Sequence, residues 1–204
     1  MLTLVGIIVG AGVNPSHQQT RMMLGDDDVT VGPLRAGFST LDDVAGQIGI
    51  SLEERRGVGC EERTTVCYKG NVGGRSVVVF FSSGTMAAKP RGLTSIGVSL
   101  SAHFPDAAGC APTRLRRFWI RTRRGVGLGM KLSQMLKTLG NPTTKERGRV
   151  HYLYSSRIRM TAAESEYHRV SVPLEAYWDV TWSLSAEFEN EALVRFEVGK
   201  TLSY

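Results

Sequence analysis

Residues 179–189 read "DVTWSLSAEFE", and this stretch decides the class of the fold. Apolar and polar side chains alternate along it, and the apolar set is Val180, Trp182, Leu184, Ala186 and Phe188. A period of two predicts a β-strand that buries one face and leaves the other in solvent. We therefore expect the intervening polar side chains to share one exposed sheet face, namely Thr181, Ser183, Ser185 and Glu187.

Five further runs have the composition of strands. They cover residues 64–70, 76–84, 93–100, 149–155 and 192–199. Only Asn190 and Glu191 separate the quoted stretch from the last run, which is short enough for a hairpin turn. In that last run Arg195 and Glu197 alternate with apolar residues and join the expected polar face. The pattern predicts antiparallel pairing throughout.

Two short helices are predicted from apolar residues at helical spacing. The second carries Leu132, Met135, Leu136 and Leu139, and the first carries Leu41, Val44, Ala45 and Ile48. Gly140 and Gly49 are placed to end these helices, and Pro142 cannot continue the second. We expect Ser39 to cap the first helix, with Asp42 and Asp43 in its first turn.

The two helices are offset by a constant 91 residues, because 132 minus 41, 135 minus 44 and 140 minus 49 all give 91. Each helix is followed by three or four strand-like runs. The sequence therefore predicts an α+β protein of two tandem units, each a short helical segment packed on a three- to four-stranded antiparallel sheet. The expected units are residues 32–110 and 125–204, joined by a basic segment, 111–124.

The amino-terminal region suggests export. Residues 2–13 form an apolar run that fits the hydrophobic part of a signal peptide, although no basic residue precedes it. We expect residues 1–19 to be a signal peptide and 20–31 a flexible lead-in. The alternatives are a start further upstream, or a buried strand of a cytosolic protein.

Three cysteines bear on the same question. A bridge between Cys67 and Cys110 would close a long loop and stabilise the fold by roughly 3 to 4 kcal/mol in an oxidising compartment. Cys60 would then be left free, so a bridge between Cys60 and Cys67 is an alternative. Three reduced, buried thiols in a cytosolic protein are the third possibility.

Signals for catalysis, metals and cofactors are weak. The four histidines, His17, His103, His151 and His168, share no metal-ligand spacing, so neither a metal site nor a cofactor is expected. "GVGLG", residues 125–129, lacks the basic residue of a phosphate loop and predicts a tight turn. We name no catalytic residue and expect a protein that is not an enzyme. An enzyme with its site in a cleft between the units is the alternative.

Residues 114–124, "RLRRFWIRTRR", hold six arginines. The whole chain has 25 basic and 19 acidic residues, so the net charge outside this segment is zero. One interpretation is a strand that joins the units, with Leu115, Ile120 and either Phe118 or Trp119 buried and the arginines paired with carboxylates. The other is a contact site for an anionic partner, an acidic protein, lipopolysaccharide or nucleic acid, formed by Arg116, Arg117, Trp119, Arg121 and Arg123.

A resemblance adds to this reading. The phrase "GVGLGMKLSQMLKTLGNP", followed by "GRVHYLYS" and a terminal hairpin, resembles the repeat of the BamE (SmpA/OmlA) outer-membrane assembly lipoproteins. In tandem, the repeat resembles the secreted β-lactamase inhibitory proteins. The resemblance implies a helical segment on a four-stranded sheet and, for two units side by side, a concave sheet surface.

We therefore expect an exported, non-catalytic protein-binding module, such as an inhibitor or an envelope-assembly factor. Another protein is the expected partner, an anionic surface is a second candidate, and no transmembrane span is expected in the mature chain. The polar sheet face is the expected contact surface.

Overall fold

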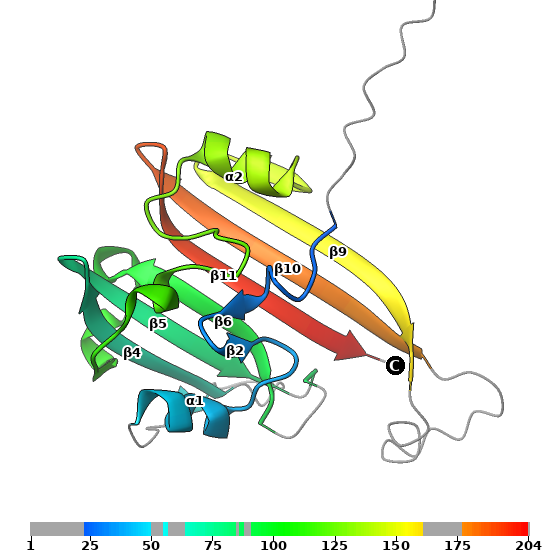
Figure 1. Ribbon diagram of the computed structural model, residues 1–204, viewed down its shortest axis with the longest axis horizontal. Helices are drawn as coiled ribbons and strands as arrows, with labels where there is room; N and C mark the ends of the chain where they lie inside the picture. The colour runs from blue at the N-terminus through cyan, green and yellow to red at the C-terminus, as the bar shows by residue number, and fades with distance from the viewer. Residues whose placement is uncertain are drawn as a thin grey trace, which may run out of the picture.

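A nine-stranded sheet forms the body of the fold in the computed structural model, which describes residues 23–49, 55–56, 64–84, 86–87, 91–160 and 177–203 (Figure 1). The strands follow the order β3-β4-β5-β6-β11-β10-β9-β8, and β7 pairs with β4 in parallel. The strands are β3 (Arg55–Arg56), β4 (Thr64–Val72), β5 (Arg75–Ser83), β6 (Leu93–Leu100), β7 (Ala111–Pro112), β8 (Thr144–Glu146), β9 (Arg149–Arg159), β10 (Tyr177–Glu189) and β11 (Ala192–Ser203). The predicted signal peptide, residues 1–19, and Cys60 lie outside the described residues.

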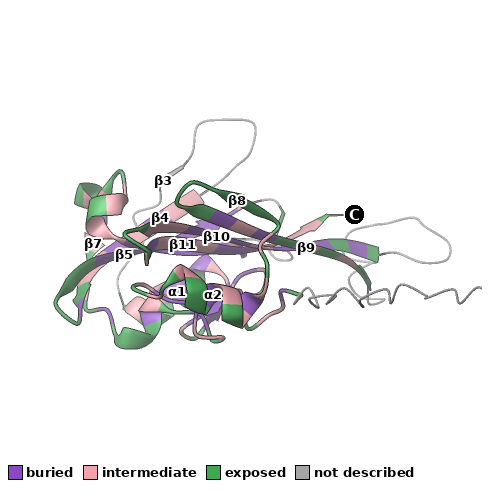
Figure 2. Cartoon of the chain, turned by 90° about the horizontal axis from the view of Figure 1, so that it is seen from above, coloured by how far each residue is buried: buried purple, intermediate pink, exposed green. Residues whose placement is uncertain are grey.

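The prediction of two helix-on-sheet units is wrong. Strands β6 and β11 pair with each other antiparallel, with Val98 opposite Phe196, and so join all the strands into one sheet (Figure 1). Both helices lie on the same face of that sheet (Figure 2). A unit of about 75 residues has a thin core, and pairing one sheet edge of each unit satisfies the backbone groups of those edges and extends one core. The runs predicted as strands do form strands, but sequence periodicity did not show this pairing.

The two helices are α1 (Leu41–Ile48) and α2 (Leu132–Leu139), as the apolar spacing predicted. Thr40 caps α1 in place of Ser39: the Thr40 hydroxyl accepts from the Asp43 backbone N–H, and the Asp43 carboxylate accepts from the Thr40 N–H. Gly49 ends α1 in the left-handed conformation, with φ of 74°. In the described part of the chain, no helix has the length and apolar character needed to cross a membrane.

The helix-bearing face of the sheet carries the main core. The layer over it contains α1, α2, the hairpin of β1 (Thr30–Val31) and β2 (Leu34–Arg35), and the short helix η3 (Arg117–Ile120). Fully buried side chains meet here from sheet and layer, among them Tyr68, Phe81, Phe196, Leu41 and Met135. We call this the covered face.

The lead-in expected to be flexible is packed where the structure describes it. Val29 and Val31 are fully buried. Asp28 is buried and forms an ion pair of 2.8 Å with Arg124. Residues 23–31 are therefore part of the covering layer, which the acidic run at 26–28 did not suggest.

Asp26 fastens this layer to the sheet. Its carboxylate accepts from the Lys200 ammonium at 2.9 Å, from Arg35 at 2.9 Å and from the Trp182 indole N–H at 3.3 Å. Partial burial by itself would raise the pKa of Asp26, but the hydrogen bonds from Lys200 and Trp182 and the charges of Lys200 and Arg35 outweigh burial and lower that pKa.

Tyr152 links the end of α2 to the sheet. Its hydroxyl donates to the Gly140 carbonyl oxygen at 3.0 Å. Burial raises the pKa of Tyr152 to about 12, because the charged phenolate would lose hydration in this position.

Candidate functional site

The predicted polar face exists and lies on the side of the sheet opposite both helices. On β10, Thr181, Ser183, Ser185 and Glu187 alternate with the buried Val180, Trp182, Leu184 and Ala186, as the sequence predicted. On β11, Arg195 stands opposite Glu187, and Glu197 stands opposite Ser185. We call this side of the sheet, from β4 to β9, the open face.

Cross-strand polar contacts connect β10 to its neighbour β9 on the open face. The His151 Nδ1 atom lies 2.9 Å from the Ser185 hydroxyl, and the Ser155 and Thr181 hydroxyls lie 3.1 Å apart. Ion pairs follow at both ends of the strands, Arg149 with Glu187 and Arg157 with Asp179. These contacts hold short polar side chains in fixed relative positions.

The centre of the open face is built from small residues. Ser82, Ser95, Gly199 and Ser183 stand opposite one another in sequence across β5, β6, β11 and β10. Leu153 of β9 ends this row and is half exposed. Among the described residues, the buried Ser95 hydroxyl has no hydrogen-bond partner. Ser82, Ser95 and Gly199 are buried, and Ser183 is the half-exposed hydroxyl of this row.

One end of the open face is covered by the loop of residues 101–110, which we call the cap loop. Phe104 of this loop packs on Phe80 of β5, with ring centroids 5.0 Å apart. Phe80 in turn lies over Gly97, where a Cβ atom would come within 1.9 Å of the ring, so only glycine fits there. The Arg195 guanidinium lies 5.4 Å from the Phe80 centroid and 5.9 Å from that of Phe104.

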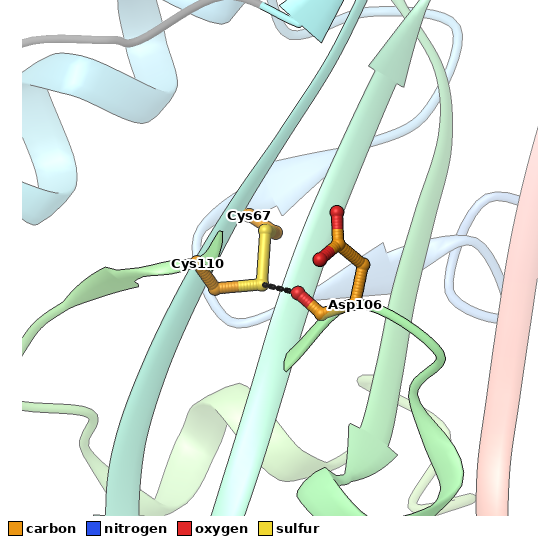
Figure 3. The surroundings of a disulfide bond; sticks show 3 residues. All are labelled: Cys67, Asp106 and Cys110. Carbon is orange, nitrogen blue, oxygen red and sulfur yellow. Dashed lines mark hydrogen bonds between the residues drawn. A yellow bond between two sulfur atoms is a disulfide. The ribbon is translucent and has the colours of Figure 1, made fainter. Parts of the chain in front are cut away.

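The disulfide between Cys67 and Cys110 ties the cap loop to β4, as predicted (Figure 3). Their Cα atoms lie 4.9 Å apart, and 43 residues separate them in the chain. The Cys110 sulfur also lies 3.6 Å from the Asp106 carbonyl oxygen (Figure 3). A disulfide sulfur carries no proton, so this is a polar contact and no hydrogen bond. At its other end the loop places His103 3.2 Å from Glu189.

The arginine-rich segment, the second predicted site, lies on the covered face. Trp119 is buried there, with its ring 5.9 Å from that of Phe81. Arg123 pairs with Asp27, whereas Arg116, Arg117 and Arg121 are exposed. The structure thus separates the two groups of predicted site residues by the thickness of the sheet.

Sequence reasoning missed the part played by Phe80 and Phe104. The run from Val77 to Phe81 is apolar throughout, so no alternation marked which of its side chains face outward. His151 was expected to face solvent and does lie on the open face, half-buried beside Ser185. The contact between His151 and Ser185 could not be predicted, because the sequence alone does not show that the two residues stand opposite each other on neighbouring strands.

The open face is suited to surface recognition. A serine next to a histidine can also begin a nucleophilic site, which requires a third group to orient the imidazole. Within the described residues, no carboxylate contacts His151, and no group of three metal-ligating side chains occurs. Among the described residues, the partly exposed groups of the open face include the hydroxyls of β10, the Glu187 carboxylate beside Arg149 and Arg195, and the Phe104 ring.

No protein-family model matches the chain, and neither a curated protein nor a solved structure shows significant similarity to it.

Proposed function

We propose that this chain is an exported, non-catalytic module that binds another protein through the open face. The observation that supports this most is the convergence of Thr181, Ser183, Ser185, Glu187, Arg195 and Glu197 on one face of β10 and β11, away from both helices. A sheet needs only one apolar face to fold, so the other is available for contacts.

The composition of the open face fits protein recognition. Interfaces combine aromatic and arginine anchors with polar groups that fix the orientation of the partner. Phe80, Phe104 and Arg195 form a stacked group at one end, and Ser183 and Ser185 lie beyond it. Phe104, Arg195, Ser183 and Ser185 are each partly exposed, so the partner would anchor at Phe104 and Arg195 and extend over the two serines.

The disulfide supports export. Bridges such as Cys67–Cys110 persist in oxidising compartments and are rare in the cytosol. The resemblance to the BamE repeat and to secreted inhibitory proteins suggests two roles for such a module, envelope assembly and inhibition. The identity of the bound protein would distinguish these roles.

A photocrosslinking amino acid at position 183 tests the proposal. Ser133 is the matched control, because it is an exposed serine on α2 at the covered side. We expect one dominant protein adduct from position 183 in the native host and none from position 133. Equal adduct patterns from both positions would contradict the proposal.

A further inference from the structure

The six arginines of residues 114–124 fall into two groups. Arg123 and Arg124 form ion pairs with Asp27 and Asp28, at 3.5 Å and 2.8 Å. The other four are exposed, and in the described part of the chain no carboxylate lies within ion-pair distance of them: Arg114, Arg116, Arg117 and Arg121. The first group therefore forms ion pairs within the covering layer, and the second forms none with the described carboxylates.

The net positive charge of the chain equals the charge of the six arginines in this segment. The chain has 25 basic and 19 acidic residues, and 25 minus the six arginines of the segment leaves 19 against 19. Arg116 and Arg121 flank the single turn of η3, which places their backbones about 10 Å apart at the rise of a 3₁₀ helix. A local cluster of this kind creates a strong positive potential over a small area.

An exposed aromatic ring stands among these guanidinium groups. Phe118 is 41% exposed. Its ring packs against Gly32, where a Cβ atom would come within 2.8 Å, and against Trp119 at a centroid distance of 5.3 Å. Trp119 is itself buried against Phe81, so the packing of Phe118 on Trp119 holds the exposed ring in place.

We infer that Arg116, Arg117, Phe118 and Arg121 form a docking surface for an anionic phospholipid membrane, and we call them the arginine surface. Guanidinium groups bind phosphate in a bidentate manner, and aromatic side chains favour the boundary between head groups and acyl chains. Clustered basic residues bind anionic leaflets additively and reversibly. The surface lies on the side of the sheet opposite the open face, so a membrane and a protein can be bound at the same time.

Nucleic acid offers the same phosphate chemistry and is the main competitor. The Cys67–Cys110 disulfide favours the membrane, because disulfide-bonded proteins work in compartments where membrane surfaces are common and nucleic acid is not. Both proposals use the disulfide as support for export, but they assign binding to different surfaces, so the binding test of either can fail alone.

Vesicle cosedimentation of the full chain tests the inference. We expect binding to phosphatidylcholine vesicles that contain about 30% phosphatidylglycerol, none to phosphatidylcholine alone, and loss of binding at about 300 mM salt. The triple variant R116Q/R117Q/R121Q should bind roughly 100-fold more weakly, since each basic residue contributes about fivefold.

A matched control separates local charge from net charge. The variant K145Q/R147Q/R159Q removes three exposed cations from the opposite edge of the sheet, on β8, on β9 and in the turn between them. It should bind the vesicles like the wild type. Equal losses in both triple variants would overturn the arginine surface. If the thermal midpoint of the first variant falls, the single variants R116Q and R117Q replace it, each with an expected fivefold loss.

Two further measurements distinguish the ligand class. In the Phe118→Trp variant, brominated lipids should quench additional fluorescence compared with the wild type, because the ring enters the acyl boundary. The protein would instead be a nucleic-acid binder if it bound a single-stranded oligonucleotide more strongly than the anionic vesicles and if R116Q/R117Q/R121Q lost that binding. This result would overturn the membrane proposal.

Discussion

The same strands form both faces of the sheet, but the two faces differ in their side chains and in their expected roles. On β10 the covered face takes Trp182 and Leu184, which are buried under the helix layer, and the open face takes Ser183 and Ser185. The covered face is apolar and closely packed, whereas the open face has short polar side chains and one stacked aromatic group. The comparison implies that substitutions on the covered face change stability and that substitutions on the open face change binding.

The largest stability effect is expected on the covered face. Phe196 of β11 is fully buried, and Phe196→Ala should lower the free energy of unfolding by about 3 to 5 kcal/mol. Thr201, on the open face of the same strand, is the control, and Thr201→Ala should change it by less than about 0.5 kcal/mol. Urea unfolding measures both. Similar losses would mean that the open face also supports the fold.

The disulfide differs from the rest of the open face, because it contributes to the stability of the fold. By the loop-entropy estimate for 43 residues, the C67S/C110S variant should lose about 4 kcal/mol. Non-reducing peptide mapping of protein from the native host should recover the two cysteines linked. Full alkylation of both thiols before reduction would refute the bridge and weaken the case for export.

Asp26 tests how the covering layer is held. Asp26→Asn should cost about 1 to 2 kcal/mol at neutral pH, toward the lower end because solvent partly screens the carboxylate. The lowered pKa of Asp26 means that its contribution is present above its ordinary pKa of 3.8 and is lost as the pH falls through the folded value. Unfolding measured below about pH 4 should therefore show a shallower pH dependence in the variant. An unchanged slope would exclude this anchor.

Tyr152→Phe should have the smallest effect on the covered face, about 1 kcal/mol, through the lost hydrogen bond to Gly140. Because the pKa of Tyr152 is raised from 10 to about 12, its neutral form stabilises the fold fully below pH 10, and this contribution is lost as the pH rises through 12. Unfolding curves from pH 9 to about 12 should show a smaller decline in the variant than in the wild type. Identical declines would show that another group titrates.

Local elements were predictable from the sequence because their signals are local. The period of two in residues 179–189 marked both the strand and its solvent face, and the apolar spacing at 41–48 and 132–139 marked the helices. The pairing of Val98 with Phe196 joins residues about a hundred positions apart, and no local pattern records it. The position of Ser39 beside Thr40 shows a smaller limit: Thr40 caps the helix, and the Ser39 hydroxyl accepts from the Arg35 backbone N–H instead.

The candidate site was predictable to the same extent. The polar residues of β10 and β11 could be named, since one strand's alternation places them on one face. The contribution of Phe80 and Phe104 could not be predicted. It depends on the cap loop packing over β5 and on its disulfide to Cys67. The sequence also did not show which arginines of residues 114–124 form ion pairs, since their partners Asp27 and Asp28 lie in a distant segment.

The most direct test of the open face as the contact surface is the affinity of its crosslinked partner, measured by titration calorimetry with purified proteins. Ser183→Arg places a bulky cation in the row of small residues, and Ser133→Arg adds the same side chain to α2. We predict that the first variant binds about 100-fold more weakly, or about 2.8 kcal/mol, and that the second binds like the wild type, with both thermal midpoints unchanged. Equal affinities for the two variants, or a loss confined to the change at Ser133, would contradict this account.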